Sequence, residues 1–342
     1  MKFNKKIISI IIISISALIL TMAYLVKFSP VVKHKTTIYI DHNKNYDNFI
    51  KELEPELNHP SLFKFIAQLK HYPELIKSGK YELNPSENLI ESINKLRIGQ
   101  QQAVSLKFNN QQNLKELSLR ISEQLDLSSE DLYSEMLNQD FLNKSGFNKQ
   151  TALAMYLPNT YKVYWNISPK KLVERMHKEY TKFWTSERIA MAKKQELSPL
   201  EVSILASIVQ KETSYTPERP DVAGLYLNRI HSGMPLQADP TVIYVLKQKY
   251  GQDFEVKRVL NKDLSIKSPY NTYLHKGLPP GPIFMPDISS IEAVLNPRQH
   301  QYLYMCASTT NIGQHKFAKT LSQHNKNANQ YRKWIQSQGI MR

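Results

Sequence analysis

The chain has 342 residues, enough for about two domains, and its 45 Lys and Arg against 30 Asp and Glu give a formal net charge of +15. This excess limits the charge-driven partners to nucleic acid, an anionic lipid surface or an acidic polymer. The one cysteine, Cys306, excludes an intramolecular disulfide.

The N-terminal segment predicts a membrane span. Lys2, Lys5 and Lys6 precede residues 7–26, which carry no charge and are mostly Ile, Leu, Val, Ala and Met. About twenty such residues cross roughly 30 Å of hydrocarbon as a helix. A cleaved signal peptide is the alternative, but the apolar run is longer than usual for one and no clean cleavage site follows it.

The basic residues before the span favour an N-terminus in the cytoplasm, although further lysines on the far side weaken the asymmetry. We therefore expect a cytoplasmic tail at 1–6, a single-pass helix at 7–26 in the cytoplasmic (inner) membrane, and an extracytoplasmic or periplasmic chain from about residue 27. That location excludes nucleic acid as a partner.

The next part of the chain predicts a small α+β module after a short spacer at 27–35. Its elements are expected in the order strand 36–40, helix 46–57, helix 61–71, strand 80–83, a helix from Ser86 to Gly99, and strand 103–108. Ser86 is expected to cap the last helix and Gly99 to end it. A unit of this size can enclose only a small core.

The remainder mixes helices with turn-rich stretches, so the predicted fold class is α+β throughout. Helices are expected at 113–125, 129–137, 169–192, 198–213 and 221–230, with a polar closing helix at 322–342. Residues 140–150 are polar and predict an irregular loop.

The helix at 198–213 ends in a carboxyl group on its apolar face. Ser198 predicts its N-cap, with Glu201 completing a capping box. Glu212 follows Ile208 by one helical turn and so continues the apolar face. Burial and the helix dipole both disfavour a carboxylate there, which should raise the pKa of Glu212 towards that of a general acid. The alternative is a solvated glutamate at a fraying helix end.

Several other chemistries lack sequence support. The chain has no HExxH, CxxC, GxGxxG, GxxxxGK[ST] or GxSxG motif, so we expect no metal site, no cofactor and no serine-hydrolase chemistry. A hydrolytic glycosidase needs a second carboxylate, and the candidates near Glu212 are Glu218, Asp221 and Asp239. Asp239 is equally suited to cap a helix that begins at Thr241. Glu218 and Asp221 are expected to serve the start of the helix that follows them.

Three aromatic, turn-rich segments suit sugar rings, which pack on Tyr and Trp faces and bind amide side chains. These segments are 156–165, 268–283 and 315–325. The alternative is that they are ordered loops packed on a core.

The ordered motifs resemble one known family. They are SGKYEL (78–83), LPNTY (157–161), KET (211–213), YLNRIHSGMPLQADPTVIY (226–244), SPYNTY (268–273), GLPPGPI (277–283) and HKFAKTLSQHN (315–325). This order resembles the endolytic murein transglycosylase family, also called YceG-like, over nearly the whole chain. The chain departs from the family pattern at Gln210, Asn159 and Asn109-Asn110, and the Gln210 departure leaves one carboxyl in the KET motif.

The resemblance implies a membrane-bound lytic transglycosylase that cuts peptidoglycan between N-acetylmuramic acid and N-acetylglucosamine and leaves a 1,6-anhydro end. It implies a LysM-like module at 36–104, a catalytic domain at 105–342, and Glu212 as the catalytic residue. The other motif residues are expected to bind the glycan strand: Gln237, Asp239, Tyr244, Tyr270, Asn271, Tyr273, His315 and Asn325. Peptidoglycan synthases are possible further partners.

Two rival functions remain at this stage. One is a muramidase that hydrolyses the same bond with Glu212 as acid and Asp239 as base or nucleophile. The other is a membrane protein that binds peptidoglycan without cleaving it, for which the basic charge and a LysM-like module suffice.

Overall fold

The computed structural model describes residues 5–256 and 258–338, which form two compact units of mixed α and β structure. Unit 1 holds the chain up to residue 106 together with residues 122–127 and 160–168. Unit 2 holds residues 107–121, residues 128–159 and the chain from residue 169 onward. Unit 1 thus includes two segments from later in the chain, whereas the sequence analysis expected one continuous module.

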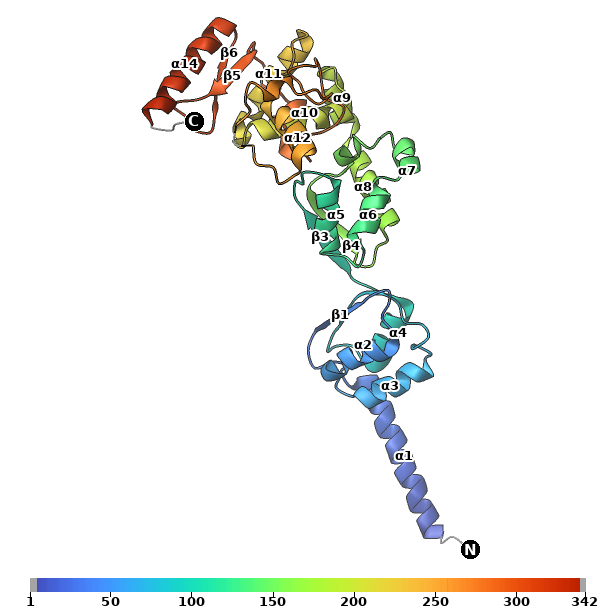
Figure 1. The fold of residues 1–342 in the computed structure, drawn as a ribbon. Helices are drawn as coiled ribbons and strands as arrows, with labels where there is room; N and C mark the ends of the chain where they lie inside the picture. The colour runs from blue at the N-terminus through green and yellow to red at the C-terminus, as the bar shows by residue number, and fades with distance from the viewer. Residues whose placement is uncertain (1–4, 257, 339–342) are drawn as a thin grey trace. The chain divides into compact units, whose positions relative to one another are not determined.

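The N-terminal helix α1 (Lys5–Phe28) has 24 residues and is long and apolar enough to cross a membrane (Figure 1). None of its side chains is buried by the rest of the described chain. Lys2, which was part of the expected cytoplasmic tail, lies outside the described residues.

Unit 1 is built on a strand pair with helices packed against it. Strand β1 (Thr36–Ile40) pairs antiparallel with β2 (Gly79–Leu83). Between and after the strands come α2 (Tyr46–Leu53), η1 (Glu54–Glu56), α3 (Pro60–Leu69) and α4 (Leu89–Ile98). Gly99 ends α4 in the left-handed region at φ 78°, as predicted, but Asn88, not Ser86, caps it through a capping box with Glu91.

The expected spacer at 27–35 is part of this core, so that prediction was wrong. Val31 and Val32 are completely buried, and β-bridges join Pro30 to Asn88 and Val32 to Leu57. Two consecutive valines have too much apolar surface to remain in water, and the first unit buries them.

Unit 2 contains most of the helices. The second strand pair, β3 (Ala103–Phe108) with β4 (Asn159–Tyr164), lies mostly in unit 1, which holds β3 up to Leu106 and β4 from Thr160 onward. The other elements are α5 (Leu114–Ser122), α6 (Ser129–Met136), α7 (Gln139–Lys144), η2 (Ala152–Met155), α8 (Pro169–Phe183), α9 (Ser186–Lys194), α10 (Pro199–Glu212), η3 (Thr216–Glu218), α11 (Arg219–His231), α12 (Asp239–Tyr250), η4 (Asp263–Ser265), α13 (Ile288–Leu295), β5 (Tyr304–Ala307), β6 (His315–Ala318) and α14 (Leu321–Ser337).

Two predictions in this region were wrong because capping side chains were overlooked. Asn138 caps α7, so the expected loop at 140–150 begins as a helix. Thr185 caps α9, so the expected helix 169–192 is two helices. A side-chain oxygen of Asn or Thr that accepts a hydrogen bond from a backbone N–H favours the start of a helix at that position.

Helix α10 lies at the centre of the unit 2 core, with α9, α11, α12 and α13 packed around it. Every residue from Val202 to Val209 is buried, so α10 is covered on all sides and not on one face only. Its serine hydroxyls are satisfied internally: Ser207 donates to Ile204 O at 2.7 Å and accepts from Ile283 N at 3.1 Å. At the C-terminal end, β5 and β6 form an antiparallel hairpin on which α14 packs (Figure 1).

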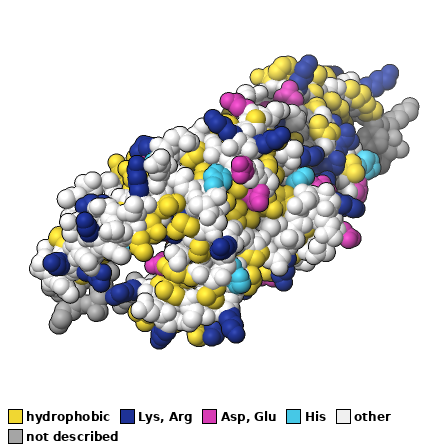
Figure 2. Space-filling view, turned by 90° about the horizontal axis from the view of Figure 1, so that it is seen from above, with side chains coloured by type: hydrophobic (Ala, Val, Ile, Leu, Met, Phe, Trp, Pro, Cys, Tyr) yellow, Lys and Arg dark blue, Asp and Glu magenta, His cyan; other side chains and the backbone are white. Residues whose placement is uncertain are grey.

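The positive charge is dispersed. Figure 2 shows Lys and Arg side chains scattered over one face of the molecule, among hydrophobic and neutral polar groups. The net charge of +15 therefore does not form a single basic band on that face.

Candidate active site

Helix α10 delivers Glu212 to the edge of the core. The predicted N-terminus is confirmed, because Ser198 accepts from Glu201 N and Glu201 accepts from Ser198 N in a capping box. Glu212 is the last residue of the helix, and Thr213 caps it. Because the cap fixes where α10 begins and its middle is fully buried, the Glu212 carboxyl group is held at one defined position.

Glu212 is partly accessible to solvent and is hydrogen-bonded by the buried Tyr226 hydroxyl from α11. Burial raises the pKa of Glu212 to about 7, and the negative charge of Asp239 acts in the same direction. The Tyr226 hydrogen bond and the positive charges of His315 and Arg229 oppose this rise without cancelling it. A carboxyl group with this pKa can both give and take a proton near neutral pH.

Removing the Tyr226 hydroxyl should raise the pKa of Glu212 further. A hydrogen bond donated to a carboxylate favours the charged form, so Tyr226→Phe withdraws one of the effects that hold the pKa down. The measurement is an NMR titration of ¹³C-labelled glutamate side chains, with Tyr215→Phe, an exposed tyrosine nearby, as the control. A Glu212 titration that is unchanged, or that moves to lower pH, would contradict this assignment.

His315 is held beside this site by a buried carboxylate. The backbone N–H of His315 donates to Glu218 Oε1 at 2.6 Å, and its ring Nδ1 lies 2.9 Å from Glu218 Oε2. An ionised carboxylate only accepts hydrogen bonds, so a proton on Nδ1 would satisfy this contact. Glu218 occupies the N-cap position of α11 but makes no capping hydrogen bond with its side chain, contrary to expectation.

Arg229 is a buried cation that supports the same region. Its Nε donates to Leu303 O at 2.7 Å, and Nη1 donates to Leu236 O. Its guanidinium also lies over the ring of Tyr304, 5.7 Å from the centroid. These contacts tie α11 to β5 and to the segment before α12.

Asp239 does not cap a helix that starts at Thr241, so that prediction was wrong. Helix α12 begins at Asp239 itself, and no side chain caps it. The Asp239 carboxylate instead accepts a hydrogen bond from Tyr273 Oη at 2.6 Å. Burial, followed by the hydrogen bond to Asp239, raises the pKa of Tyr273, which keeps this phenol protonated.

Gln237 and Asn271 differ in exposure. Gln237 is exposed and has a positive φ of 50°, a conformation that is uncommon for a residue other than glycine and that concentrates at functional sites. Asn271 is fully buried: its amide donates to Leu264 O and Ile266 O and accepts from Tyr273 N. Asn271 therefore shapes the loop that presents Tyr273, and a direct contact with a ligand is no longer expected.

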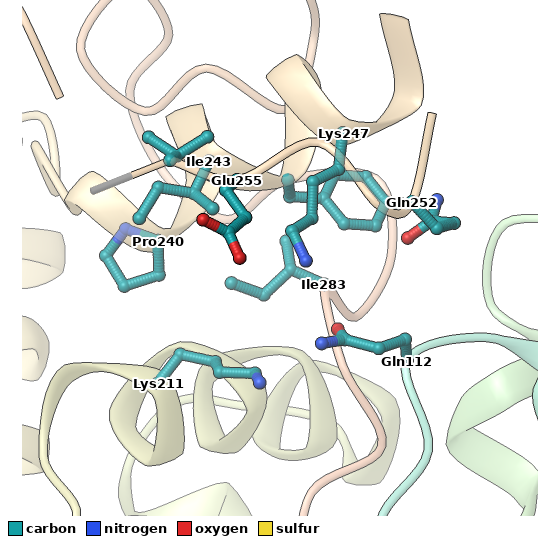
Figure 3. A pocket seen from close by; sticks show the side chains of 10 residues that line it. Gln112, Lys211, Pro240, Ile243, Lys247, Gln252, Glu255 and Ile283 are labelled. Atoms are coloured by element: carbon teal, nitrogen blue, oxygen red, sulfur yellow. The ribbon is translucent and has the colours of Figure 1, made fainter. Parts of the chain in front are cut away.

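Tyr244 and Tyr270 pack together, with ring centroids 4.8 Å apart, and line an elongated depression. A cavity of about 740 Å³ includes both rings, and a second of about 430 Å³ includes Tyr244 (Figure 3). The two cavities share Gln112, Tyr244 and Gln252. Glu212 lines neither cavity, although its neighbour Lys211 lines the smaller one.

The structure thus gathers part of the predicted set around Glu212. The charges of Asp239 and His315 both act on the pKa of Glu212, and Tyr273 donates a hydrogen bond to Asp239. Asn325 is exposed on α14, and its side chain makes no hydrogen bond within residues 5–256 and 258–338. In that same part of the chain, no group of three or more His, Cys, Asp or Glu side chains is placed to hold a metal ion.

Two important residues were not identified from the sequence, Tyr226 and Arg229, and Glu218 was identified without its contact to His315. Tyr226 begins the long motif 226–244 and Arg229 lies inside it, so motif membership was an available signal. Their roles depend on partners far away in the chain, which spacing does not reveal.

The sequence is similar to one protein family and to named bacterial proteins. The sequence matches the YceG-like family over residues 38–330. A Bacillus subtilis (strain 168) protein named endolytic murein transglycosylase is 38% identical over 165 residues, which cover 48% of this chain and 43% of that protein. A Streptococcus pneumoniae (strain D39) protein of the same name is 26% identical over 323 residues, which cover 86% of this chain and 58% of that protein. The chain thus spans about half the length of the curated relatives it matches.

A solved structure is similar as well. The crystal structure of a yceG-like protein from Listeria monocytogenes superimposes with a TM-score of 0.55 and 30% sequence identity. The match covers 86% of this chain and 99% of that one.

Proposed function

The chain belongs to the YceG-like family, and from that premise we propose that it is a membrane-anchored endolytic transglycosylase of peptidoglycan. It is a carbon–oxygen lyase that cleaves the bond between N-acetylmuramic acid and N-acetylglucosamine. Glu212 acts first as general acid and then as general base. The names of the relatives from Bacillus subtilis and Streptococcus pneumoniae support the substrate class.

The observation that carries the proposal is a partly accessible carboxyl group, Glu212, which ends the buried helix α10 and accepts a hydrogen bond from the Tyr226 hydroxyl. Burial raises the pKa of Glu212 to about 7, so the protonated form that donates to the glycosidic oxygen as the bond breaks is available near neutral pH. An oxocarbenium-like centre then develops at C1 of the muramic acid.

The same carboxyl group completes the reaction. Once deprotonated, Glu212 removes the proton from the C6 hydroxyl of the same muramic acid, and that oxygen bonds to C1. The product is a 1,6-anhydro ring, and Glu212 is again protonated. No water and no enzyme nucleophile takes part, so one catalytic carboxyl is sufficient.

The neighbouring groups have supporting roles in this proposal. His315, held by Glu218, supplies positive potential that stabilises the Glu212 carboxylate midway through the reaction. Asp239 and Tyr273 form a hydrogen-bonded pair beside it that binds sugar hydroxyls. The Tyr244–Tyr270 pair offers aromatic faces to further sugar rings, and Gln237 an amide.

The N-terminal part of the chain is consistent with an enzyme that acts on newly made peptidoglycan at the membrane. We propose that α1 is a single-pass anchor with a cytoplasmic N-terminus, since it is long and apolar enough to cross a membrane and none of its side chains is buried in the described part of the chain. We assign the LysM-like, glycan-binding role expected for residues 36–104 to unit 1, and the catalytic role expected for residues 105–342 to unit 2. Peptidoglycan synthases are the expected neighbours at the membrane.

Product analysis distinguishes this proposal from a muramidase that uses Asp239 as base or nucleophile. We expect mass spectrometry of digested uncrosslinked glycan to show anhydro-muramic ends, which are lighter than reducing ends by one water. Asp239→Asn should lower the rate but leave the product unchanged, because Asp239 binds sugar and does not activate water. Reducing ends would instead establish hydrolysis, and binding of glycan without any soluble fragment would establish a non-catalytic protein.

A further inference from the structure

A cavity of about 430 Å³ lies beside the catalytic helix and is not used by the chemistry described above. Its floor is apolar, and lysine, glutamine and glutamate side chains point into it (Figure 3). We call it the lysine cavity; its lining includes Gln112, Lys211, Ile243, Lys247, Gln252 and Glu255. Its volume lies within the range of small-ligand sites.

The lysine cavity has unbalanced positive charge. Lys211 and Lys247 both line the cavity and form no ion pair within the described parts of the chain, and the positive charge of Lys247 disfavours the charged form of Lys211. Burial, together with Lys247, lowers the pKa of Lys211, whose ammonium lies 3.5 Å from the centroid of the Phe284 ring. An anion placed between the two ammonium groups would relieve their repulsion.

The nearby carboxylates do not already fill this role. Glu116 influences Lys211 but is occupied at the start of α5, where it accepts from Gln112 N at 3.0 Å and from Asn113 Nδ2 at 3.3 Å. Glu255 comes from the segment after α12 and enters the cavity opposite Lys211 (Figure 3). The cavity therefore offers two cations and one anion to a ligand.

The lysine cavity and the catalytic carboxyl adjoin the same two helix ends. Lys211 directly precedes Glu212 on α10, and Pro240, in the cavity wall, directly follows Asp239 on α12. Tyr244, one helical turn further on, belongs to this cavity and to the larger neighbouring one. The lysine cavity is thus linked in sequence to both Glu212 and Asp239.

The glycan itself cannot satisfy these charges, because N-acetylated sugars are neutral. In peptidoglycan the ionised groups are on the short peptide that branches from the lactyl group of muramic acid. This peptide has carboxylates and, at its diamino acid, an amino group. An extended peptide reaches about 3.3–3.6 Å per residue, so a few residues extend well beyond the sugar that bears them.

We propose that the lysine cavity binds the stem peptide of the muramic acid next to the scissile bond, with Lys211 and Lys247 paired with its carboxylates and Glu255 with its amino group. This inference rests on the proposed function for the identity of the polymer. It assigns the enzyme a preference for peptide-bearing glycan over glycan from which the peptides have been removed.

Binding to a catalytically disabled chain tests the preference without relying on turnover. Full-length Glu212→Gln protein in detergent is titrated by calorimetry with glycan chains of one length, carrying their peptides or stripped of them by an amidase. We expect the peptide-bearing chains to bind about tenfold more tightly, since each charge-assisted hydrogen bond is among the stronger polar contacts. In the same background, Lys211→Met with Lys247→Met should bind both chains equally.

Matched variants separate the cavity from general charge effects. Lys193→Met removes an exposed lysine at the end of α9 and should keep the tenfold preference. Replacing Lys211 and Lys247 by arginine should largely retain it as well. Equal binding of both chains by the parent protein, an undiminished preference in the double methionine variant, or displacement by inorganic phosphate as effective as by free peptide would each overturn the proposal.

The two proposals fail in different ways. If the protein binds peptide-bearing chains selectively but wild type releases no fragments, the lysine cavity stands and the transglycosylase proposal falls. If wild type releases anhydro products equally from both kinds of chain and shows no binding preference, the enzyme stands and the lysine cavity does not.

Discussion

Glu212→Gln should abolish the release of anhydro-muropeptides from peptidoglycan while the protein folds as before. Glutamine has nearly the same shape and can still accept the Tyr226 hydrogen bond, but it has no proton to give near neutral pH. Loss of general acid–base catalysis alone lowers a rate by about 10²- to 10⁴-fold. The measurement is quantitative chromatography of soluble products, with circular dichroism to establish that the variant is folded.

A glutamate of similar chemistry outside the site provides the control. Glu187 is exposed in the first turn of α9. Surface substitutions of this kind usually change stability little, so Glu187→Gln should leave product release within about twofold of wild type. If Glu212→Gln retained wild-type activity, Glu212 would not be the acid, and the mechanism proposed above would have to be abandoned.

Arg219→Met should reduce the stability of unit 2 by about 3 kcal/mol, because removing one partner of a buried ion pair leaves the other charge uncompensated. Arg219 is only 6% exposed. Its Nη1 donates to both oxygens of Asp287, at 2.9 and 2.8 Å, and to Ser289 Oγ at 2.6 Å. Asp287 in turn caps α13, which packs on α10. Urea unfolding followed by tryptophan fluorescence measures the loss.

An exposed ion pair on the same helix gives the comparison. Arg298 donates to Asp221 Oδ2 at 2.7 Å, but its side chain is 61% exposed, so Arg298→Met should cost less than about 1 kcal/mol. Equal losses from Arg219→Met and Arg298→Met would show that burial does not decide the importance of these pairs.

The Arg219–Asp287 pair also predicts a pH dependence. Burial alone would raise the pKa of Asp287, but hydrogen bonds from Arg219, from the Ser290 backbone and from Ser289 lower it below its ordinary value. A lowered pKa in the folded state stabilises the protein at pH values above the ordinary pKa, and this stabilisation is lost as the pH falls through the lowered one. The stability difference between wild type and Arg219→Met should therefore shrink in acid.

The limits of a helix were predictable from the sequence wherever the residues at its two ends include recognisable capping residues. The limits of α10 follow from Ser198, Glu201 and the proline between them, and the end of α4 follows from Gly99, which adopts the left-handed conformation. Errors arose where the signal was subtle, as at Thr185, or where burial depended on distant elements, as for Val31 and Val32.

The candidate acid was predictable for the same reason, since Glu212 follows an apolar helix at helical spacing. Its hydrogen-bond donor was not, because Tyr226 is on the next helix and reaches Glu212 only once α10 and α11 pack. Asn271 shows the opposite error: it lies in a motif, yet folding buries it and uses its amide to fix a loop.

By itself, the sequence determined the apolar N-terminal helix, the mixed α+β character, the family and one carboxyl group at the end of a buried helix. These features follow from sequence motifs and from the spacing of residues that are close together in the sequence. Only the tertiary structure decided that Glu218 would hold His315, that Tyr226 would bond Glu212, and that Lys211 and Lys247 would share a cavity. Hydrogen bonds and desolvation depend on distances between atoms, and for residues far apart in the chain those distances are set only when the helices pack.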